Sequence, residues 1–550
     1  MLRISNFALF YPFYIKFSSF PPFFPCFPTK IHLAHKLLLY KTISRISYKN
    51  HCFSNSENSG KRKGKTMEYI FSGLEPQNVL KNFWDLSQVY SRRADNTQGI
   101  SDYLANFGKK LGLKVIQDPT TNVIIYKPAS KGYENAPTVM LAGHMDMICA
   151  ANPGVVHDFD NEPLKLILDA DGDTIHADGT TLGADDGLGL AFILSVLESD
   201  TIAHPAIEAV FTTNEETDMK GAWELNYSAL TSKIILSLDA TRLSLGGAGE
   251  LEMEMFMNYQ SVPSREGDVQ STLAIFGLIG GHSGKNAFAE RGNANTLLIR
   301  VLSDLQKNKK VPFRIVRFTG GDYTACAFAR EAACTISYPE KYKVIVEHAV
   351  DEWQKLYSSE LAVPDPNVKL TCTPAEKVTE TLSDNDTDRF ITFMTILPDG
   401  LCSLHKHFEH KYESCVNVGV VEMQENAIRV ITCIRSALAS KKYFQFDKIE
   451  KVCHVMGVTY NILHDLPQWE YNNHARVAEV IGSIYADMEP NVAQGTCEQG
   501  IFLMHMPGAE AAGVGPVVDS PHSPNEKISI HTLTDDWNRF VRVLEAMINY

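Results

Sequence analysis

The sequence lacks features that would place it in several other protein classes. No apolar run is both long enough and free enough of charge to span a bilayer. The 11 cysteines are scattered without CxxC pairs or framework spacing, which is typical of reduced interior thiols in an intracellular protein. The formal net charge of -14 argues against nucleic acid as a main partner, because phosphate binding needs a basic surface. These absences favour a cytoplasmic protein that binds neither membranes nor nucleic acid.

Acidic residues are nearly absent from residues 1–66, where Glu57 is the only one, and a basic cluster at residues 61–65 ends this segment. Such a composition is typical of an organellar transit peptide. The alternative, which we favour, is a translated region upstream of a true start at Met67. In either case the segment is excluded from the predicted fold.

The rest of the chain is long enough for more than one core, since 44% of all residues are hydrophobic. Predicted helices and strands alternate over residues 67–250. Residues 251–465 have an α+β pattern, and the alternating pattern resumes over residues 466–550. We therefore predict an α/β fold. Its catalytic domain has a mixed, mostly parallel sheet flanked by helices, and an α+β lid domain interrupts it.

Carboxylates and a histidine follow three short apolar runs that are predicted to be buried strands. His144 and Asp146 follow the run at residues 138–141, Glu215 and Glu216 follow the run at residues 206–211, and Asp239 follows the run at residues 234–236. In an open parallel sheet, ligands bind beyond the carboxyl ends of the strands. A metal site is therefore expected where these strands end.

Asp185 and Asp186 lie in a glycine-rich turn, residues 179–187, that opens an apolar helix. An aspartate at a helix start is ordinarily an N-cap, but two in succession before a buried helix favour one carboxylate that points into a site. Glu215 and Glu216 would ordinarily form an exposed acidic loop. Buried beside Asp185, however, they would repel one another strongly unless cations neutralise them. A dinuclear metal centre resolves that conflict.

Together these motifs resemble metallopeptidase family M20, and more narrowly its aminoacyl-histidine dipeptidase (X-His dipeptidase, peptidase D) branch. The motifs that carry the resemblance are His144-x-Asp146, residues 179–187, Glu215-Glu216, Asp239 and residues 520–526. The similarity extends from Met67 to Tyr550. Three positions depart from the family pattern: Asp186 replaces an expected Asn, Ala240-Thr241 replace a frequent Ser-Glu, and Gln494 lies near an expected His.

The resemblance implies a zinc-peptidase-like catalytic domain that binds two divalent metal ions. Imidazole and carboxylate ligands suit Zn²⁺ best, with Mn²⁺ or Co²⁺ as substitutes. The implied ligands form two sets that share one carboxylate: His144, Asp185 and Asp239 for one ion, and Asp185, Glu216 and His522 for the other. In the same scheme Asp146 orients His144, and Glu215 acts as the general base.

The resemblance also implies substrate contacts from the lid domain. The glycine cluster before His282 fails as a phosphate loop, because Asn286 replaces the Ser or Thr that would hold magnesium. By resemblance, His282 instead approaches the substrate carbonyl oxygen, in its own subunit or in a partner. Arg435 would hold the substrate carboxylate by two hydrogen bonds, and Asn295 would add a polar contact. Family members are commonly homodimers through this domain.

The implied function is hydrolysis of small dipeptides, including Xaa-His dipeptides such as carnosine. The same metal residues would also serve an aminoacylase, a carboxypeptidase or a tripeptidase. A non-catalytic metal or peptide binder, or a purely structural cation site, remains a further alternative. Glu215 discriminates between these classes, because a binder needs no general base beside its ligands.

Overall fold

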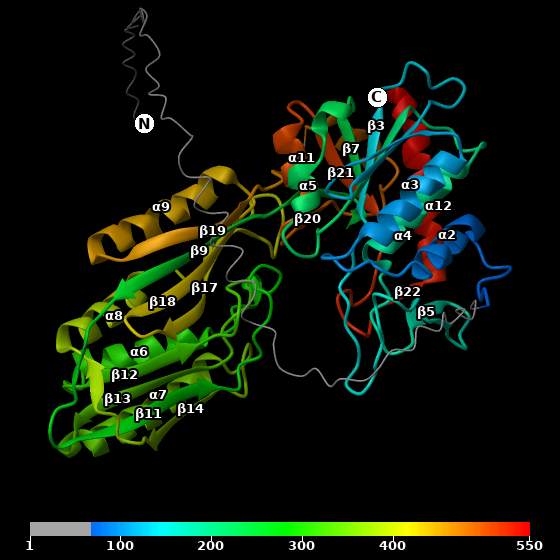
Figure 1. The fold of residues 1–550 in the computed structure, drawn as a ribbon. Coiled ribbons are helices and arrows are strands. Elements are labelled where there is room, and N and C mark those ends of the chain that lie inside the picture. The colour runs from blue at the N-terminus through cyan, green and yellow to red at the C-terminus, as the bar shows by residue number, and fades with distance from the viewer. Residues whose placement is uncertain (1–67, 473) are drawn as a thin grey trace, which may run out of the picture. The chain divides into compact units, whose positions relative to one another are not determined.

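The computed structural model describes residues 68–472 and 474–550. The predicted leader, residues 1–66, lies outside the described residues. Two large β-sheets organise the described part of the chain, and Figure 1 shows their strands and helices. Across these residues, no helix has the length and apolar character needed to cross a membrane.

The first sheet has eight strands in the order β1-β2-β6-β3-β7-β21-β8-β20. Their bounds are β1 (Lys114–Gln117), β2 (Val123–Lys127), β3 (Val139–His144), β6 (Ile207–Thr212), β7 (Ile234–Thr241), β8 (Ser244–Gly247), β20 (Asn491–Ala493) and β21 (Glu510–Gly515). β3 is parallel to both β6 and β7, and β7 is parallel to β21, whereas β1 and β2 pair antiparallel. The prediction of a mixed, mostly parallel sheet is confirmed.

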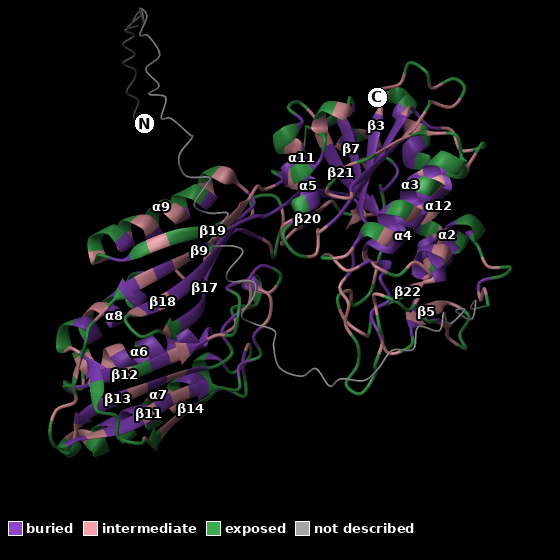
Figure 2. Ribbon diagram, viewed as in Figure 1, coloured by how far each residue is buried: buried purple, intermediate pink, exposed green. Residues whose placement is uncertain are grey.

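Helices with apolar faces flank the first sheet. They are α2 (Gln77–Ser87), α3 (Gln98–Lys110), α4 (Ala184–Glu198), α5 (Lys220–Glu224), α10 (Arg476–Gly482), α11 (Glu498–His505) and α12 (Ile530–Ala546). Because helices cover the sheet, its central strands are mostly apolar, and β3 and β6 are buried along their whole length. Figure 2 shows β3 in the colour of buried residues. A small sheet of β4 (Leu166–Leu168), β5 (Thr174–Ala177) and β22 (Lys527–Ser529) joins both ends of this part of the chain.

The second sheet is antiparallel, and its strands run in the order β14-β11-β13-β12-β17-β18-β9-β19, with β16 paired to β17. Their bounds are β9 (Gly249–Asn258), β11 (Asp268–Phe276), β12 (Arg314–Gly320), β13 (Ala332–Pro339), β14 (Lys369–Pro374), β16 (Gly400–Leu404), β17 (Tyr412–Met423), β18 (Ala427–Ser436) and β19 (Thr459–Leu466). The helices of this segment are α6 (Ala294–Lys307), α7 (Lys343–Glu360), α8 (Asp384–Ile396) and α9 (Ala439–Met456), and a ribbon of β10 (Ser261–Pro263) and β15 (Glu380–Leu382) completes it.

Strand β9 shows why this sheet has two different faces. Side chains alternate along a strand, so every second residue shares a face. One face of β9 joins the apolar core through Leu251, Met253, Met255 and Met257. The other face carries Glu250, Glu252 and Glu254.

Asp399 precedes β16 and supplies a pH-dependent contribution to stability. Its carboxylate accepts hydrogen bonds from the Val418 amide (2.9 Å) and the Asn293 side chain (3.4 Å), and burial raises the pKa of this carboxyl to about 6. The folded state therefore holds this proton more tightly than the unfolded state does. Between about pH 4 and pH 6 this group is expected to lower the free energy of unfolding by up to about 3 kcal/mol as the pH rises.

We expect Asp399→Asn to remove this part of the pH dependence, as measured by urea unfolding of parent and variant across that range. Asp388→Asn, at an exposed position of α8, is the matched control and should keep the parent's profile. An unchanged pH profile in Asp399→Asn would contradict the assignment.

Candidate active site

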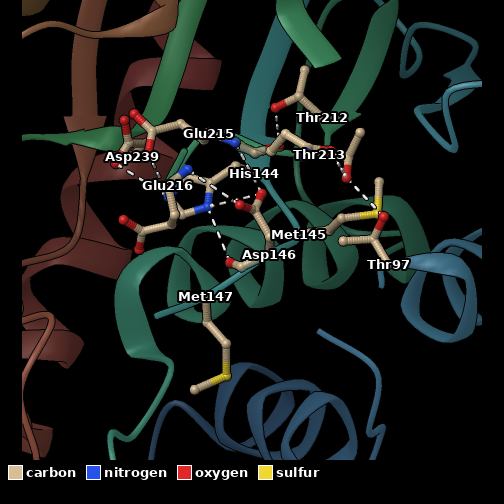
Figure 3. A network of polar contacts seen from close by, with 12 residues as sticks. Thr97, His144, Met145, Asp146, Met147, Thr212, Thr213, Glu215, Glu216 and Asp239 are labelled. Atoms are coloured by element: carbon tan, nitrogen blue, oxygen red, sulfur yellow. Dashed lines mark hydrogen bonds and ion pairs between the residues drawn. The ribbon is translucent and has the colours of Figure 1, made fainter. Parts of the chain in front are cut away.

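The strand order brings the predicted site residues to one edge of the first sheet. Because β3 lies between β6 and β7 and is parallel to both, the carboxyl ends of the three strands meet. His144 is the last residue of β3, Asp239 lies near the end of β7, and Glu215 and Glu216 follow β6. Figure 3 shows these side chains converging. Asp185 joins them from the first turn of α4.

Two histidines face opposite oxygens of Asp185. His144 Nε2 lies 3.2 Å from Asp185 Oδ1, and His522 Nε2 lies 3.1 Å from Asp185 Oδ2. His144 Nε2 is also 3.7 Å from Asp239 Oδ1, and His522 Nε2 is 3.1 Å from Glu216 Oε2. The structure thus brings all five predicted metal ligands together, with Asp185 between the two histidines.

Asp146 positions both His144 and the acidic loop. The Nδ1 atom of His144 donates to the backbone carbonyl of Asp146 at 3.1 Å, which leaves Nε2 as the nitrogen that faces Asp185. The Asp146 carboxylate lies farther from Nδ1, at 3.8 Å, and accepts the amides of Glu215 (3.2 Å) and Glu216 (3.1 Å) instead (Figure 3). The sequence predicted an orienting carboxylate; the backbone atom is the nearer contact.

The electrostatics of the cluster fit a bound divalent cation. Burial raises the pKa of the Glu215 carboxyl well above its usual value, and the charges of Asp239 and Glu216 raise it further. Among the described residues, the buried Oε1 atom of Glu216 has no hydrogen-bond partner. Ligand atoms of His144, Asp185 and Glu216 all lie within 4.8 Å of one another. An ion of the zinc class, which takes imidazole and carboxylate ligands, suits this donor set.

Glu526 holds the turn that carries Asp185, a role that sequence reasoning missed. Its buried carboxylate accepts four consecutive backbone N–H groups: Leu182 (2.7 Å), Gly183 (2.9 Å), Ala184 (2.9 Å) and Asp185 (3.1 Å). These N–H groups belong to the turn before the regular part of α4, since Asp185 and Asp186 have non-helical backbone angles. Buried backbone N–H groups of this kind need an acceptor. The only sign of this role in the sequence is that Glu526 is the acidic residue at the end of the motif at residues 520–526.

Glu526→Gln is expected to weaken metal binding about 10–100-fold, the usual cost of losing a group that orients a ligand. The glutamine NH₂ would face amide donors in place of an accepting oxygen, so the Asp185 turn would shift. Metal affinity measured by competition with a chelator tests this. Asn525→Ala, at the exposed neighbouring position, should bind metal as the parent does. Equal affinities in parent and Glu526→Gln would show that the turn is held by other contacts.

Arg92 is a second positioning residue that the sequence did not reveal. This arginine is 3% exposed, and it donates from Nε to the Met145 carbonyl (3.2 Å) and from Nη2 to the Gly183 carbonyl (3.3 Å). It therefore joins the end of β3 to the turn before α4. Because both acceptors are backbone atoms, no motif in the sequence points to this contact.

Asp186, which departs from the family pattern, is accommodated by two glycines. A Cβ atom at Gly143 would lie 2.3 Å from one carboxylate oxygen of Asp186, and a Cβ at Gly189 would lie 2.1 Å from the other. The carboxyl is 3% exposed, and burial raises its pKa well above the usual value. Because Gly143 and Gly189 have no side chains, the Asp186 carboxyl fits between them.

His282 is held as a neutral imidazole with a defined tautomer. Its Nδ1 accepts the amides of Gly284 and Lys285, each at 3.0 Å, so the proton resides on Nε2. Burial, together with the positive charges of Arg435 and Lys285, lowers the pKa of His282 to about 4. Nε2–H is therefore available as a donor at neutral pH.

Arg435 lies beside His282, whereas Asn295 does not. The Arg435 side chain is buried on β18, with Nη1 2.6 Å from Glu250 Oε2, Nη2 3.3 Å from His282 Nε2, and Nε donating to Ser283 Oγ at 3.3 Å. Asn295 is fully buried, and its Nδ2 donates to the carbonyls of residues 418 (3.1 Å) and 419 (3.3 Å). This placement favours a structural role for Asn295.

Gln494, the third departure from the family pattern, makes a contact through its backbone. Its carbonyl oxygen accepts the Tyr412 hydroxyl at 2.8 Å. The Gln494 Nε2 atom is buried and has no hydrogen-bond partner among the described residues. Nothing in the structure explains why glutamine occupies this position.

Comparison with known proteins agrees with this geometry. The chain is 29% identical over 486 residues to the cytosol non-specific dipeptidase of Escherichia coli (strain K12), covering 86% of this chain and 99% of the relative. It is 29% identical over 174 residues to peptidase T of Clostridium botulinum, covering 27% of this chain and 41% of that protein.

Among solved structures, the crystal structure of aminoacylhistidine dipeptidase from Vibrio alginolyticus matches with a TM-score of 0.78 and 29% identity, covering 87% of this chain and 98% of that chain. These matches confirm the resemblance found in the sequence. The model of peptidase family M20/M25/M40 matches residues 140–550. The chain therefore belongs to peptidase family M20/M25/M40 and is a hydrolase.

Proposed function

We propose that this hydrolase is a dipeptidase that binds two divalent metal ions, with Zn²⁺ as the best match to its ligands and Mn²⁺ or Co²⁺ as substitutes. The proposed ligand sets are His144, Asp185 and Asp239 for one ion, and Asp185, Glu216 and His522 for the other. The observation that carries this proposal is the placement of Asp185, whose two oxygens face two different histidines at 3.2 and 3.1 Å. A carboxylate in that position can bridge two ions.

Glu215 is the proposed general base. Its Oε2 lies 4.0 Å from His144 Nε2, and burial raises the pKa of its carboxyl. When bound, paired metal ions supply Lewis acidity and bring the pKa of bound water towards neutrality. Glu215 then takes a proton from the attacking water and delivers it to the leaving amine. Asp146 holds the loop that carries Glu215 through its hydrogen bond to the Glu215 amide.

His282 and Arg435 are the proposed substrate contacts. The neutral His282 donates Nε2–H to the substrate carbonyl oxygen and stabilises negative charge that develops there. Arg435 attracts the free carboxylate of a short peptide, which favours dipeptides over longer chains. We extend the proposal to Xaa-His dipeptides such as carnosine because the matched Vibrio alginolyticus structure is named an aminoacylhistidine dipeptidase.

The proposal includes a cytoplasmic homodimer. The described cysteines are free thiols, and the Escherichia coli relative is named a cytosol dipeptidase. Strand β19 is an edge of the second sheet, with Ile462 48% and Leu463 43% exposed. Such an edge can pair with a second copy of the chain. The second sheet would then act as both lid and dimer interface.

A substrate panel tests the proposed reaction. The full chain, loaded with Zn²⁺ or Mn²⁺, is assayed with carnosine, other Xaa-His dipeptides, dipeptides without histidine, tripeptides and N-acyl amino acids. We expect turnover of dipeptides and little or none of the other two classes. Faster turnover of N-acyl amino acids or tripeptides would replace the dipeptidase assignment, and metal binding without turnover of any substrate would indicate a binding protein.

A further inference from the structure

A second cluster of metal-ligating side chains lies on the second sheet, away from the ligands proposed for catalysis. Cross-strand register builds it, because Cys433 on β18 and His464 on β19 are both paired with Glu252 on β9. Directly paired residues share a face of the sheet, and Glu250 lies two residues before Glu252 on that face. Cys326, from the segment after β12, completes the cluster.

The side-chain atoms of this cluster are close enough to share one ion. The carboxylate of Glu250 and the thiols of Cys326 and Cys433 place ligand atoms within 4.8 Å of one another. Glu250 Oε1 accepts from Cys326 Sγ at 3.1 Å and lies 2.8 Å from His464 Nε2. Glu250 Oε1 thus lies between the Cys326 thiol and the His464 ring nitrogen, and the Cys433 thiol lies within 4.8 Å of the Glu250 and Cys326 ligand atoms.

The outer contacts of His464 match those of a metal-binding histidine. Such a histidine coordinates through one ring nitrogen and directs the other towards a carboxylate or carbonyl group. Here Nε2 faces the cluster, and Nδ1 lies 3.7 Å from Glu252 Oε2. Glu252 is itself fixed, since its Oε1 accepts the Ala325 amide at 3.1 Å, one residue before Cys326.

The charge around the cluster favours a divalent cation. Glu250 and Glu252 contribute two negative charges, and Arg435 contributes one positive charge through its 2.6 Å ion pair with Glu250 Oε2. That pair uses the Glu250 oxygen that points away from Cys326 and His464. Ionisation of both thiols on binding would leave Glu250, Glu252, the two thiolates and Arg435 with a net charge of about minus three, most of which a divalent ion neutralises. The His464 side chain is 36% exposed and gives the ion a route from solvent.

We propose that Glu250, Cys326, Cys433 and His464 form a site for a thiophilic divalent cation of the zinc class. Two thiolates, an imidazole and a carboxylate are the ligand types that zinc takes in tetrahedral sites. The ion would fasten the Cys326 segment to β9, β18 and β19. The Cys326 carbonyl also accepts the Ser283 amide at 2.7 Å, so the site would help to fix the loop that carries His282.

Cadmium provides a direct test, because Cd²⁺–thiolate charge transfer gives an ultraviolet band that carboxylate and imidazole ligands do not give. We expect the full-length protein to develop this band on titration with Cd²⁺. The band should disappear in Cys326→Ser/Cys433→Ser, and this variant should bind one equivalent of Zn²⁺ per chain fewer than the parent. Glu252→Gln should retain the band with an affinity for Cd²⁺ about 10–100-fold weaker.

Cys497→Ser is the matched control, since the Cys497 thiol is buried near the charges of Asp239 and Glu215 in the candidate active site. It should keep the full band. Absence of the band in the parent, or its persistence in the double variant, would overturn the proposal. So would a Cys326–Cys433 disulfide in protein purified without added oxidant, which would identify a redox pair. If the double variant fails to fold, the parent band and the Glu252→Gln titration still decide. None of these readouts depends on peptidase activity.

Discussion

Replacing Glu215 with glutamine is expected to lower kcat about 10²–10⁴-fold while the protein still binds two metal ions. Glutamine keeps the size of the side chain but cannot accept the proton of the attacking water. The amide of residue 215 would still donate to Asp146, so the loop should keep its position. Steady-state kinetics on a dipeptide substrate, combined with metal analysis of the same sample, measures both effects.

Asp218→Asn is the matched control for this substitution. Asp218 lies in the same loop and loses the same charge, but it is exposed. Its kcat should stay close to that of the parent. A similar loss of kcat in both variants would point to the charge of the loop, whereas a Glu215→Gln variant without metal would show that Glu215 is a ligand and not the base.

Asp185→Ala is expected to remove both metal ions and all measurable peptidase activity. Each oxygen of Asp185 faces a different histidine, so one substitution takes a ligand from both proposed positions. Loss of Asp239 or His522 alone removes a ligand from only one position, so those variants should retain one ion. Metal content per chain after dialysis, measured by mass spectrometry, separates these cases.

Asp171→Ala, in an exposed turn, controls for the loss of an aspartate and should keep two ions. An Asp185→Ala protein that retains one ion would show that the carboxylate does not bridge. Refolding controls are needed here, because the cluster of carboxylates around residue 185 repels itself when cations are absent. Circular dichroism of the metal-free parent and variant provides that comparison.

Most of the proposed metal ligands lie beside a local signal in the sequence. His144 and Asp239 follow apolar strands, and Asp185 opens an apolar helix. Because β3, β6 and β7 are parallel neighbours, their carboxyl ends meet at one edge of the sheet. His522 had no such local signal, and only the resemblance to the family pointed to it.

The contacts that position the active-site residues could not be predicted from the sequence. Glu526 and Arg92 act on backbone amides and carbonyls, which every residue possesses, so no pattern of side chains marks their partners. Asn295, which the resemblance predicts as a substrate contact, is fully buried and donates to the carbonyls of residues 418 and 419, and the sequence did not indicate that burial.

The cluster of Glu250, Cys326, Cys433 and His464 shows a third limit. Cys433 and His464 become neighbours of Glu252 only through the register of three antiparallel strands, and β19 contains an irregularity between Ile462 and His464. A shift by one residue would turn these side chains to the opposite face. Spacing along the sequence therefore does not reveal this group.

The interruption of the first sheet has a consequence for biosynthesis. β7 and β21 are parallel neighbours, yet the whole second sheet is translated between them. A ribosome makes His144, Asp185 and Glu216 before the second sheet, whereas it makes His522 and Glu526 only after that sheet. Domains generally fold as they leave the ribosome, but this one must wait for its last strand. A nascent chain that has made β7 but not yet His522 therefore carries the acidic residues of the proposed site without one of its proposed metal ligands.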